Sequence, residues 1–480
     1  MTNAALRGKP DAGNPHVRFD EGEVASAATP RRGSLLYSKV TETSGKVAFA
    51  AAAICAAAVC AAKPAAERMD RSKLLIGAYC LQENTKTDAH VKAIHDCGVD
   101  FIIGGLPASD RATLDIFAKH GVGAIVNGVV PGWWGGDGKR AGKMRETNPP
   151  EKYAAGAAAF KDHPAIWAID IGDEPSALDF PYYGDVVRQL NKAIPGMPLY
   201  LNLYPNYASV AQNDGKQTIN QLGTKTYAEH VDVYCREVPL DYISYDFYPY
   251  MASSGGTDRF LSKMYDNFIV VSEACRRTKR SFWYVPQVNS RGGLPPTSEN
   301  RLRFQANAAL SFGAEAITWA CWCKGWWTNN VIDVTGKQTE QYGKLKRVNA
   351  ELKQVGLHYM RFRNVATRLV GFAPDSPRRP RLPYSGAPDD PGYVKASNGA
   401  PLIVGEMVAR DPACGERAYF VTAADDPADV HPATFDIVFN VKAKRVEAFG
   451  GSGAIPVVRR PDGSCAVPLA SCQGVLIVLH

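Results

Sequence analysis

The chain has 480 residues, of which 45% are hydrophobic, 21% charged and 10% aromatic. This composition is typical of a globular protein with a large core, and it excludes a disordered or collagen-like chain. The 55 Lys and Arg residues against 48 Asp and Glu give a formal net charge of +7. That excess is too small and too dispersed to indicate nucleic-acid binding. No stretch reaches the ~18 strongly apolar residues of a membrane helix, so no stable membrane span is expected.

Residues 1–70 are predicted to be a disordered leader that contains a signal-like segment. Residues 1–45 are polar and lack a hydrophobic period, which indicates disorder. Lys46 is followed by sixteen apolar residues rich in alanine. The pattern over 46–62 predicts a secretory signal, and therefore a secreted, periplasmic or cell-surface protein. Because the preceding stretch is too long for the n-region of a signal, we expect translation to begin near Val40. A short uncleaved anchor or an Ala-rich helix is the alternative.

Residues 71–360 alternate short apolar runs with amphipathic stretches. The apolar runs, each predicted as a strand, are 74–79, 101–104, 123–127, 166–171, 199–203, 242–245, 282–285 and 316–320. Amphipathic stretches such as 110–121 and 298–313 have apolar residues at helical spacing, with Asp110 and Ser298 where N-caps belong. Strict alternation predicts an α/β fold, a closed (β/α)8 TIM barrel with a parallel sheet. A doubly wound open sheet is the alternative, but no glycine-rich fingerprint follows the first strand.

The sequence pattern changes after residue 360. Residues 374–393 are rich in proline, and the segments that follow have the composition of short strands bounded by Gly, Asp and Pro. The predicted strands are 402–408, 418–423, 434–440, 445–450 and 474–479. Residues 361–480 are therefore predicted to form a small C-terminal antiparallel β-sandwich. Such a module more often packs on its barrel than binds sugar.

Nine cysteines follow the leader. Cys321 and Cys323 have no second pair at zinc-site spacing, so neither a metal nor another cofactor is expected. Cys465 and Cys472 are candidates for a disulfide in an oxidising compartment. For most of the cysteines, burial as small hydrophobic side chains is the favoured interpretation.

The reacting groups of a TIM barrel lie on the loops that follow its strands. The residues predicted at that end are Tyr79 after the first strand, Asn127 and Trp133 after the third, Asp173 and Glu174 after the fourth, Asn202 and Tyr204 after the fifth, Asp246 and Tyr248 after the sixth, Gln287 after the seventh, and Trp319 and Trp322 after the eighth. Carboxylates, amides and aromatic rings suit an uncharged, hydroxylated ligand, so a carbohydrate is the expected partner. A single tryptophan is more often core than sugar platform, but the clustering of four near the eighth strand favours a platform.

Glu174 is the candidate general acid. Glycoside hydrolysis needs a protonated carboxyl for the leaving oxygen and a second group for the positive charge that develops on the sugar. Pro175 biases Glu174 toward an extended backbone, and repulsion by Asp173 raises the pKa of Glu174. Neighbouring strand residues point to opposite faces, so both carboxyls reach one pocket only if the chain bends at Gly172. Asp246 is the best second carboxylate.

Each of the other carboxylates also has a structural interpretation. Asp173 could be the partner of an arginine, and Asp246 could be a hydrogen-bond acceptor at a strand end. Asp170 is expected to face the barrel interior as a buried, paired carboxylate.

The barrel resembles the clan A glycoside hydrolases, especially the beta-galactosidase-like barrels with an appended β-sandwich. The resemblance covers residues 74–480, although its specific motifs are short. Asp-Glu-Pro at 173–175 resembles the Asn-Glu-Pro that carries the clan's general acid/base, which implies that role for Glu174. Residues 245–249, Tyr-Asp-Phe-Tyr-Pro, resemble a sugar-binding turn after strand six. The chain departs from the clan at strand seven, where the nucleophilic glutamate is replaced by Gln287.

Three functions follow from this departure. In the first case, the protein is an inverting enzyme in which Asp246 or Asp173 activates water opposite Glu174. The two carboxyl groups would then be about 6.5–9.5 Å apart. Alternatively, Gly-Asp-Glu at 172–174 resembles the family 20 hexosaminidases, in which the substrate's acetamide attacks and the aspartate orients it. In the third case, the barrel has lost catalysis and only binds carbohydrate. The neighbouring carboxyls of Asp173 and Glu174 favour an enzyme, and Gln287 favours a binding protein.

Overall fold

The computed structural model describes residues 64–131, 141–208, 221–251, 257–323, 328–381, 392–424, 434–470 and 472–480. The signal-like segment and Trp133 lie outside the described residues. Lys63–His480 form one compact unit. In the described part of the chain, no helix is both long and apolar enough to cross a membrane.

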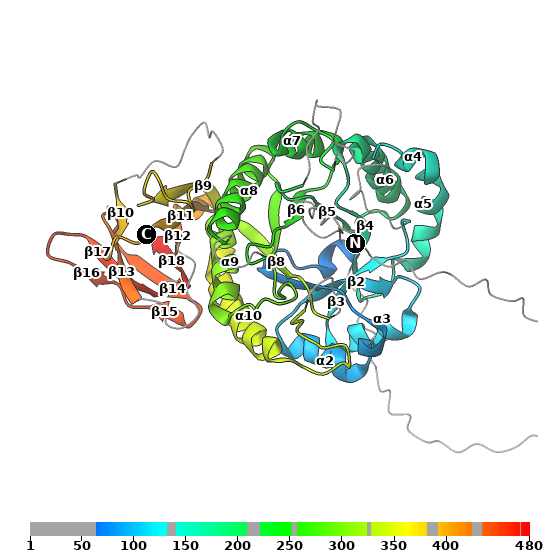
Figure 1. The fold of residues 1–480 in the computed structure, drawn as a ribbon, viewed down its shortest axis with the longest axis horizontal. Coiled ribbons are helices and arrows are strands. Elements are labelled where there is room, and N and C mark those ends of the chain that lie inside the picture. Colours follow the sequence, from blue (N-terminus) through cyan, green and yellow to red (C-terminus); the bar gives the residue numbers. More distant parts are fainter. Residues whose placement is uncertain are drawn as a thin grey trace, which may run out of the picture. The chain divides into compact units, whose positions relative to one another are not determined.

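The first part of this unit is a closed barrel of parallel strands, in chain order from β1 to β8 (Figure 1). The strands are β1 Leu75–Tyr79, β2 Phe101–Pro107, β3 Gly123–Asn127, β4 Ile166–Asp173, β5 Leu199–Leu203, β6 Tyr242–Asp246, β7 Ser281–Val285 and β8 Ala314–Trp319. Their residues are mostly buried on both faces, because side chains fill the interior and helices cover the outside. The predicted (β/α)8 barrel is confirmed.

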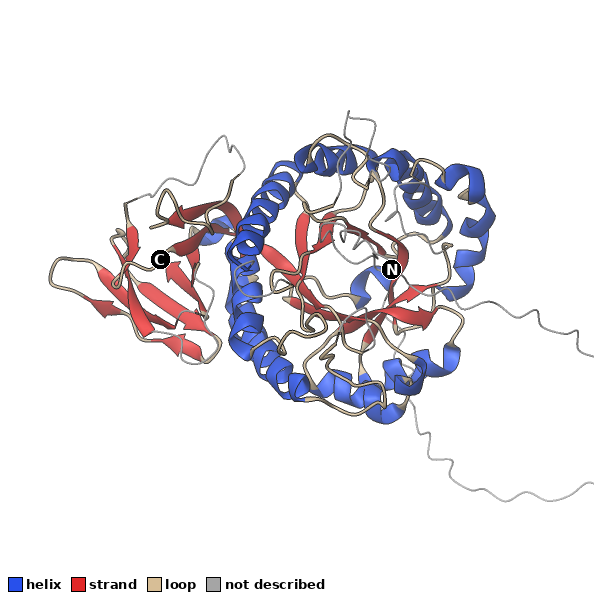
Figure 2. Ribbon diagram, in the orientation of Figure 1, coloured by secondary structure: helices blue, strands red, loops and turns tan. Residues whose placement is uncertain are grey.

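Helices surround the strands as an outer ring (Figure 2). They are α2 Asp88–Asp96, α3 Arg111–His120, α4 Met144–Thr147, α5 Glu151–Ala157, α6 Phe180–Ala193, α7 Tyr227–Glu237, α8 Thr257–Thr278, α9 Glu299–Ser311 and α10 Glu340–Tyr359, preceded by the short α1 Ala65–Arg68. The predicted caps are formed: Asp110 accepts a hydrogen bond from the backbone N–H of Thr113, and Ser298 accepts one from Arg301. Local sequence therefore determines where these helices begin.

Two antiparallel sheets follow the barrel, as predicted. One has the order β15-β14-β18-β12-β11-β9 and the other β10-β13-β17-β16. Their strands are β9 Phe362–Val370, β10 Val394–Ala396, β11 Leu402–Ala409, β12 Arg417–Ala423, β13 Thr434–Phe439, β14 Val446–Gly450, β15 Gly453–Ile455, β16 Val458–Arg459, β17 Cys465–Ala470 and β18 Gly474–Leu479. The sequence did not predict β9, β10, β15, β16 or β17. In β9, arginines interrupt the apolar residues.

The larger sheet packs closely on the barrel. A Cβ atom at Gly405 of β11 would lie 2.2 Å from the backbone oxygen of Ser311, at the end of α9, so only glycine fits there. Asn307 of α9 donates to the backbone oxygen of Cys472, and Tyr265 of α8 donates to that of Ala424. Cys472 and Cys465 are both free thiols, so the candidate disulfide between them is not formed.

Candidate active site

The carboxyl ends of β4, β5 and β6 bring a set of polar side chains together. Strand register places Asp173 beside Asn202 and Asn202 beside Ser244. The Asn202 amide nitrogen donates to Asp173 Oδ1 at 3.2 Å and to Asp246 Oδ1 at 2.9 Å. The Ser244 hydroxyl donates to the Asn202 amide oxygen at 3.0 Å. Asn202 therefore holds two carboxylates at once, and Ser244 determines which way its amide points.

Glu174 completes this group through a turn of the backbone. Its carboxyl interacts with that of Asp246, whose pKa burial raises and this interaction partly lowers, and only 7% of Glu174 is exposed. The extended backbone predicted from Pro175 is wrong, because Glu174 has φ 44°, in the left-handed region. A non-glycine residue adopts this conformation at an energetic cost, and such cost is typical of functional positions. The turn directs the Glu174 carboxyl toward β6 rather than along β4.

A β-bulge in β4 allows its carboxylates to share one face. Asp170 pairs with Tyr200 and Gly172 with Leu201, so β4 advances two residues while β5 advances one. Residues three apart, such as Asp170 and Asp173, normally point to opposite faces, but the extra residue brings them to the same face. The bulge at Gly172 aligns Asp170 with Asp173, whereas Glu174 reaches the group through its own left-handed backbone.

Gly172 is required at this bulge for steric reasons. A Cβ atom on Gly172 would lie 2.7 Å from the hydroxyl oxygen of Tyr183. Tyr183 is fully buried, so its ring has little room to move away. The bulge therefore depends on a residue without a side chain.

Three carboxyls in this site have raised pKa values. Burial, together with the nearby charge of Asp173, raises the pKa of Asp170 to about 7 and that of Asp246 to about 7. Burial raises the pKa of Asp173 to about 6, although the hydrogen bond from Asn202 opposes this rise. Asp170 and Asp173 keep some accessible surface, yet protein surrounds them on most sides, so the burial effect dominates. The site can therefore hold protons close to neutral pH.

These carboxylates accept hydrogen bonds from an amide and from a backbone N–H group. Within the described residues, Asp170, Asp173 and Asp246 form no ion pair with Lys, Arg or His. No ion pair of Asp170 is found in the described part of the chain. Asp170 instead accepts a hydrogen bond from the backbone N–H of Gly172, and Asp173 has Asn202, not an arginine, as its partner.

We expect Asp170→Asn to stabilise the protein at neutral pH. The folded-state pKa of about 7 lies above the ordinary 3.8, so the folded protein binds this proton more tightly than the unfolded chain. The stability from Asp170 is thus present at about pH 4 and is lost as the pH rises through about 7. Asparagine carries no such charge. The free energy of unfolding of the variant should therefore exceed that of the wild type by on the order of 1–3 kcal/mol at about pH 7.5 and by little at about pH 4.5.

Urea unfolding of both proteins at the two pH values measures this difference. Asp162→Asn, at an exposed position, is the matched control and should show no pH-dependent gain. A variant at Asp170 with the same pH dependence as the wild type would contradict the expectation.

A hydrogen-bonded chain of hydroxyl groups extends the site to β1. The Tyr79 and Tyr200 hydroxyls are 2.5 Å apart, and the Tyr200 hydroxyl is 2.8 Å from that of Ser244. Tyr79 thereby connects to Asn202. Tyr200 is not predicted from the sequence, and Ser244 is placed at this end of the barrel without a role; they stand two residues before Asn202 and Asp246 and share their faces. That two-residue spacing was the signal that could have identified them.

Other predicted residues stand at or just beyond the carboxyl ends of barrel strands. Tyr204 and Tyr248 are buried, and burial followed by the charge of Asp246 raises the pKa of Tyr248. The side-chain oxygen of Asn127 and the indole N–H of Trp322 are buried and have no hydrogen-bond partner within the described residues. They are an acceptor and a donor that a bound hydroxylated ligand could satisfy.

Gln287 and Trp319 lie in different surroundings. Both are fully buried. The Gln287 amide accepts from the backbone N–H of Tyr250 at 2.7 Å and donates to the backbone oxygen of Asn289 at 2.9 Å. The Trp319 indole N–H donates to Asn349 of α10, outside the barrel wall. The structure does not bring these two side chains together with the carboxylates.

Several solved structures are similar to this chain at low sequence identity. No family model and no curated protein matches this sequence. Among solved structures, one described as a glycoside hydrolase matches with a TM-score of 0.48 at 10% identity, covering 85% of this chain and 92% of its own. A family 51 alpha-L-arabinofuranosidase from Bifidobacterium longum matches with a TM-score of 0.42 at 10% identity, over 85% of this chain and 96% of its own. The endo-beta-1,4-mannanase of Thermotoga petrophila matches with 0.41 at 10%, over 84% and 94%. At this identity, no residue role passes from those proteins to this one.

Proposed function

We propose that this protein is a glycoside hydrolase that cleaves a neutral glycan or glycoside. The observation that carries the proposal is the cluster of carboxyls in which Asn202 donates to both Asp173 and Asp246 while the buried Glu174 interacts with Asp246. Two neighbouring carboxyls that share a proton supply an acid and an ionised group at the same pH. Glycoside hydrolysis needs this combination.

Glu174 is the proposed acid. In the proposed arrangement Glu174 carries the proton and Asp246 is its acceptor. When the substrate binds, the Glu174 carboxyl gives this proton to the leaving oxygen. A direct interaction of this kind brings the two carboxyls closer than the about 6.5–9.5 Å of an inverting pair. We therefore assign to Asp246 the role of positioning and reprotonating Glu174. We assign to Asp173 the role of the base that activates water, or of the group that stabilises the positive charge on the sugar.

The proposed substrate class rests on the uncharged groups around the carboxylates. Asn127 and Trp322 offer a buried acceptor and donor, and Tyr79 and Tyr248 add hydroxyl groups. Within the described residues, no Lys or Arg pairs with the site's aspartates, which supports an uncharged ligand over an anionic sugar.

A substrate-assisted hexosaminidase is the second candidate. It is favoured by Gln287, because an amide stands after strand seven where a carboxylate nucleophile would be needed. The Gln287 amide is also held by hydrogen bonds to backbone groups. The substrate's own acetamide would then attack, with Asp173 orienting it and Glu174 as the acid. A barrel that binds carbohydrate without cleaving it is the remaining alternative.

Product stereochemistry separates these functions. The wild-type protein is incubated with a panel of aryl glycosides with and without a 2-acetamido group, and proton NMR follows the first-formed anomer. Inversion supports Asp173 as the base for water. Retention restricted to the 2-acetamido sugars supports substrate assistance. Binding on a glycan array without sugar release would refute hydrolysis.

The protein is also proposed to be exported, on the basis of the signal-like segment 46–62. N-terminal sequencing of material recovered outside the cytoplasm should show a start beyond this segment. An intact residue 1 on cytoplasmic protein would contradict export.

A further inference from the structure

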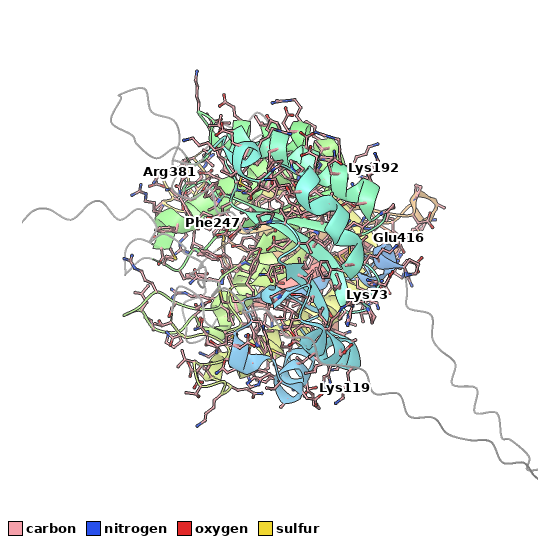
Figure 3. The ribbon with its side chains drawn as sticks, turned by 90° about the vertical axis from the view of Figure 1, so that its right-hand side faces the viewer. Lys73, Lys119, Lys192, Phe247, Arg381 and Glu416 are labelled. Atoms are coloured by element: carbon pink, nitrogen blue, oxygen red, sulfur yellow. The ribbon has the colours of Figure 1, made fainter. Side chains whose placement is uncertain are left out.

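The end of the barrel opposite the carboxylates contains a groove with an unusual charge. Figure 3 shows Phe247, which follows β6, on one side of the molecule and Lys73, which precedes β1, toward the other. The groove lies at the amino ends of β7 and β8, where it is bounded by the end of α8 and the start of β9. It has a volume of about 620 Å³. This volume is in the range of small-molecule sites.

Six basic side chains line this groove against two acidic ones. The basic residues are Arg71, Arg276, Lys279, Arg280, Arg363 and Arg410. The acidic residues, Asp241 and Glu315, pair with Arg71 and Arg410. The other four cations have no acidic partner within the described residues.

Two of these four cations, Arg280 and Arg276, form hydrogen bonds that connect the elements around the groove. Arg280 donates to the backbone oxygens of Cys235 and Val238, at the end of α7, at 2.9 and 3.0 Å. Arg276 donates to the side-chain oxygen of Asn364 at 2.8 Å, which links α8 to β9. Both keep their full positive charge, because a neutral oxygen accepts the hydrogen bond without cancelling it.

The remaining two cations, Lys279 and Arg363, are exposed. Lys279 directly follows α8 and has φ 56°, a left-handed conformation that glycine adopts without strain. A lysine therefore occupies a position where local backbone energetics favour glycine. Strain retained at a charged residue in a cavity is characteristic of a functional position.

We propose that this groove is a second ligand site, which binds a small oligoanion carrying two or more phosphate or sulfate groups. Guanidinium groups match the geometry of such oxygens, and Lys279 adds a point charge. A ligand with several anionic groups is favoured over a single ion because the uncompensated cations come from separate segments: α8, the turn between α8 and β7, and β9. The site is separate from the carboxylates and does not depend on the proposed hydrolysis.

Isothermal titration calorimetry with inorganic tripolyphosphate at low ionic strength tests the site, with inorganic phosphate as the comparison. We expect saturable binding of one tripolyphosphate per chain, at least about tenfold tighter than phosphate and weakened by added salt. Absence of binding, or equal binding of both probes, would overturn the proposal.

Two variants locate the binding. Lys279→Gly removes a charge and the backbone strain together, so it should bind tripolyphosphate several-fold more weakly while its melting temperature is unchanged or higher. Arg363→Gln should weaken binding similarly. Lys152→Gln together with Lys161→Gln, at exposed positions on the α5 side of the barrel, is the matched control and should bind like the wild type. Binding unchanged in both groove variants would refute this location, whether or not the protein hydrolyses glycosides.

Discussion

Glu174→Gln is expected to lower kcat by about 10²–10⁴-fold, the usual contribution of a general acid. Glutamine has the shape of glutamate and can still donate a hydrogen bond to Asp246, so the site should keep its geometry. It has no acidic proton to give to the leaving oxygen. Circular dichroism and thermal unfolding should therefore match the wild type while turnover is lost.

The leaving group makes this test specific. A substrate with an acidic leaving group, such as 2,4-dinitrophenol, needs little protonation, so Glu174→Gln should lose much less activity on it than on an alkyl glycoside. Glu151→Gln, at an exposed position of α5, is the matched control and should leave both rates unchanged. Equal losses on both substrates would show that Glu174 is not the acid.

Asn202→Ala should produce the second large effect, through the pKa values of the site. The Asn202 amide donates to Asp173 and to Asp246, and each hydrogen bond lowers the pKa of its carboxyl. Without the amide, both pKa values rise. If Asp173 must be ionised for turnover, the acidic limb of the kcat/KM profile moves to higher pH, and kcat/KM falls by about 10–100-fold near that limb.

A pH–rate profile measured on the neutral substrate reports this shift. Loss of structure alone would lower kcat/KM at every pH without moving the limb, so the profile distinguishes positioning from damage. Asn191→Ala, at an exposed position of α6, is the control and should leave the profile in place. A limb at the wild-type pH in Asn202→Ala would contradict the role assigned to the amide.

Much of the fold could be predicted because its signals are local. The strands of the barrel are short apolar runs separated by amphipathic helices, and the caps at Asp110 and Ser298 mark where α3 and α9 begin. A strand end at the carboxyl side of a barrel is a known place for chemistry, so Glu174, Asp173 and Asp246 could be proposed without coordinates.

The relations among those residues could not be predicted, because they depend on contacts between strands. The bulge in β4 is a matter of register against β5, and it alone decides that Asp170 and Asp173 share a face. Asn202 was expected to contact substrate, but its position between two carboxylates follows from the pairing of β5 with β4 and β6.

The sequence by itself determined the order of strands and helices, their approximate bounds and the residue types at the carboxyl end of the barrel. Periodicity and capping are properties of neighbouring residues, so one chain is enough to detect them. Only the tertiary structure decided that Glu174 turns onto Asp246 through a left-handed backbone, although Pro175 alone favours an extended one. The tertiary structure also decided that the Gln287 amide is buried and hydrogen-bonded to backbone groups. Both outcomes arise because packing and hydrogen bonds from distant segments outweigh a local preference of a few kcal/mol at most.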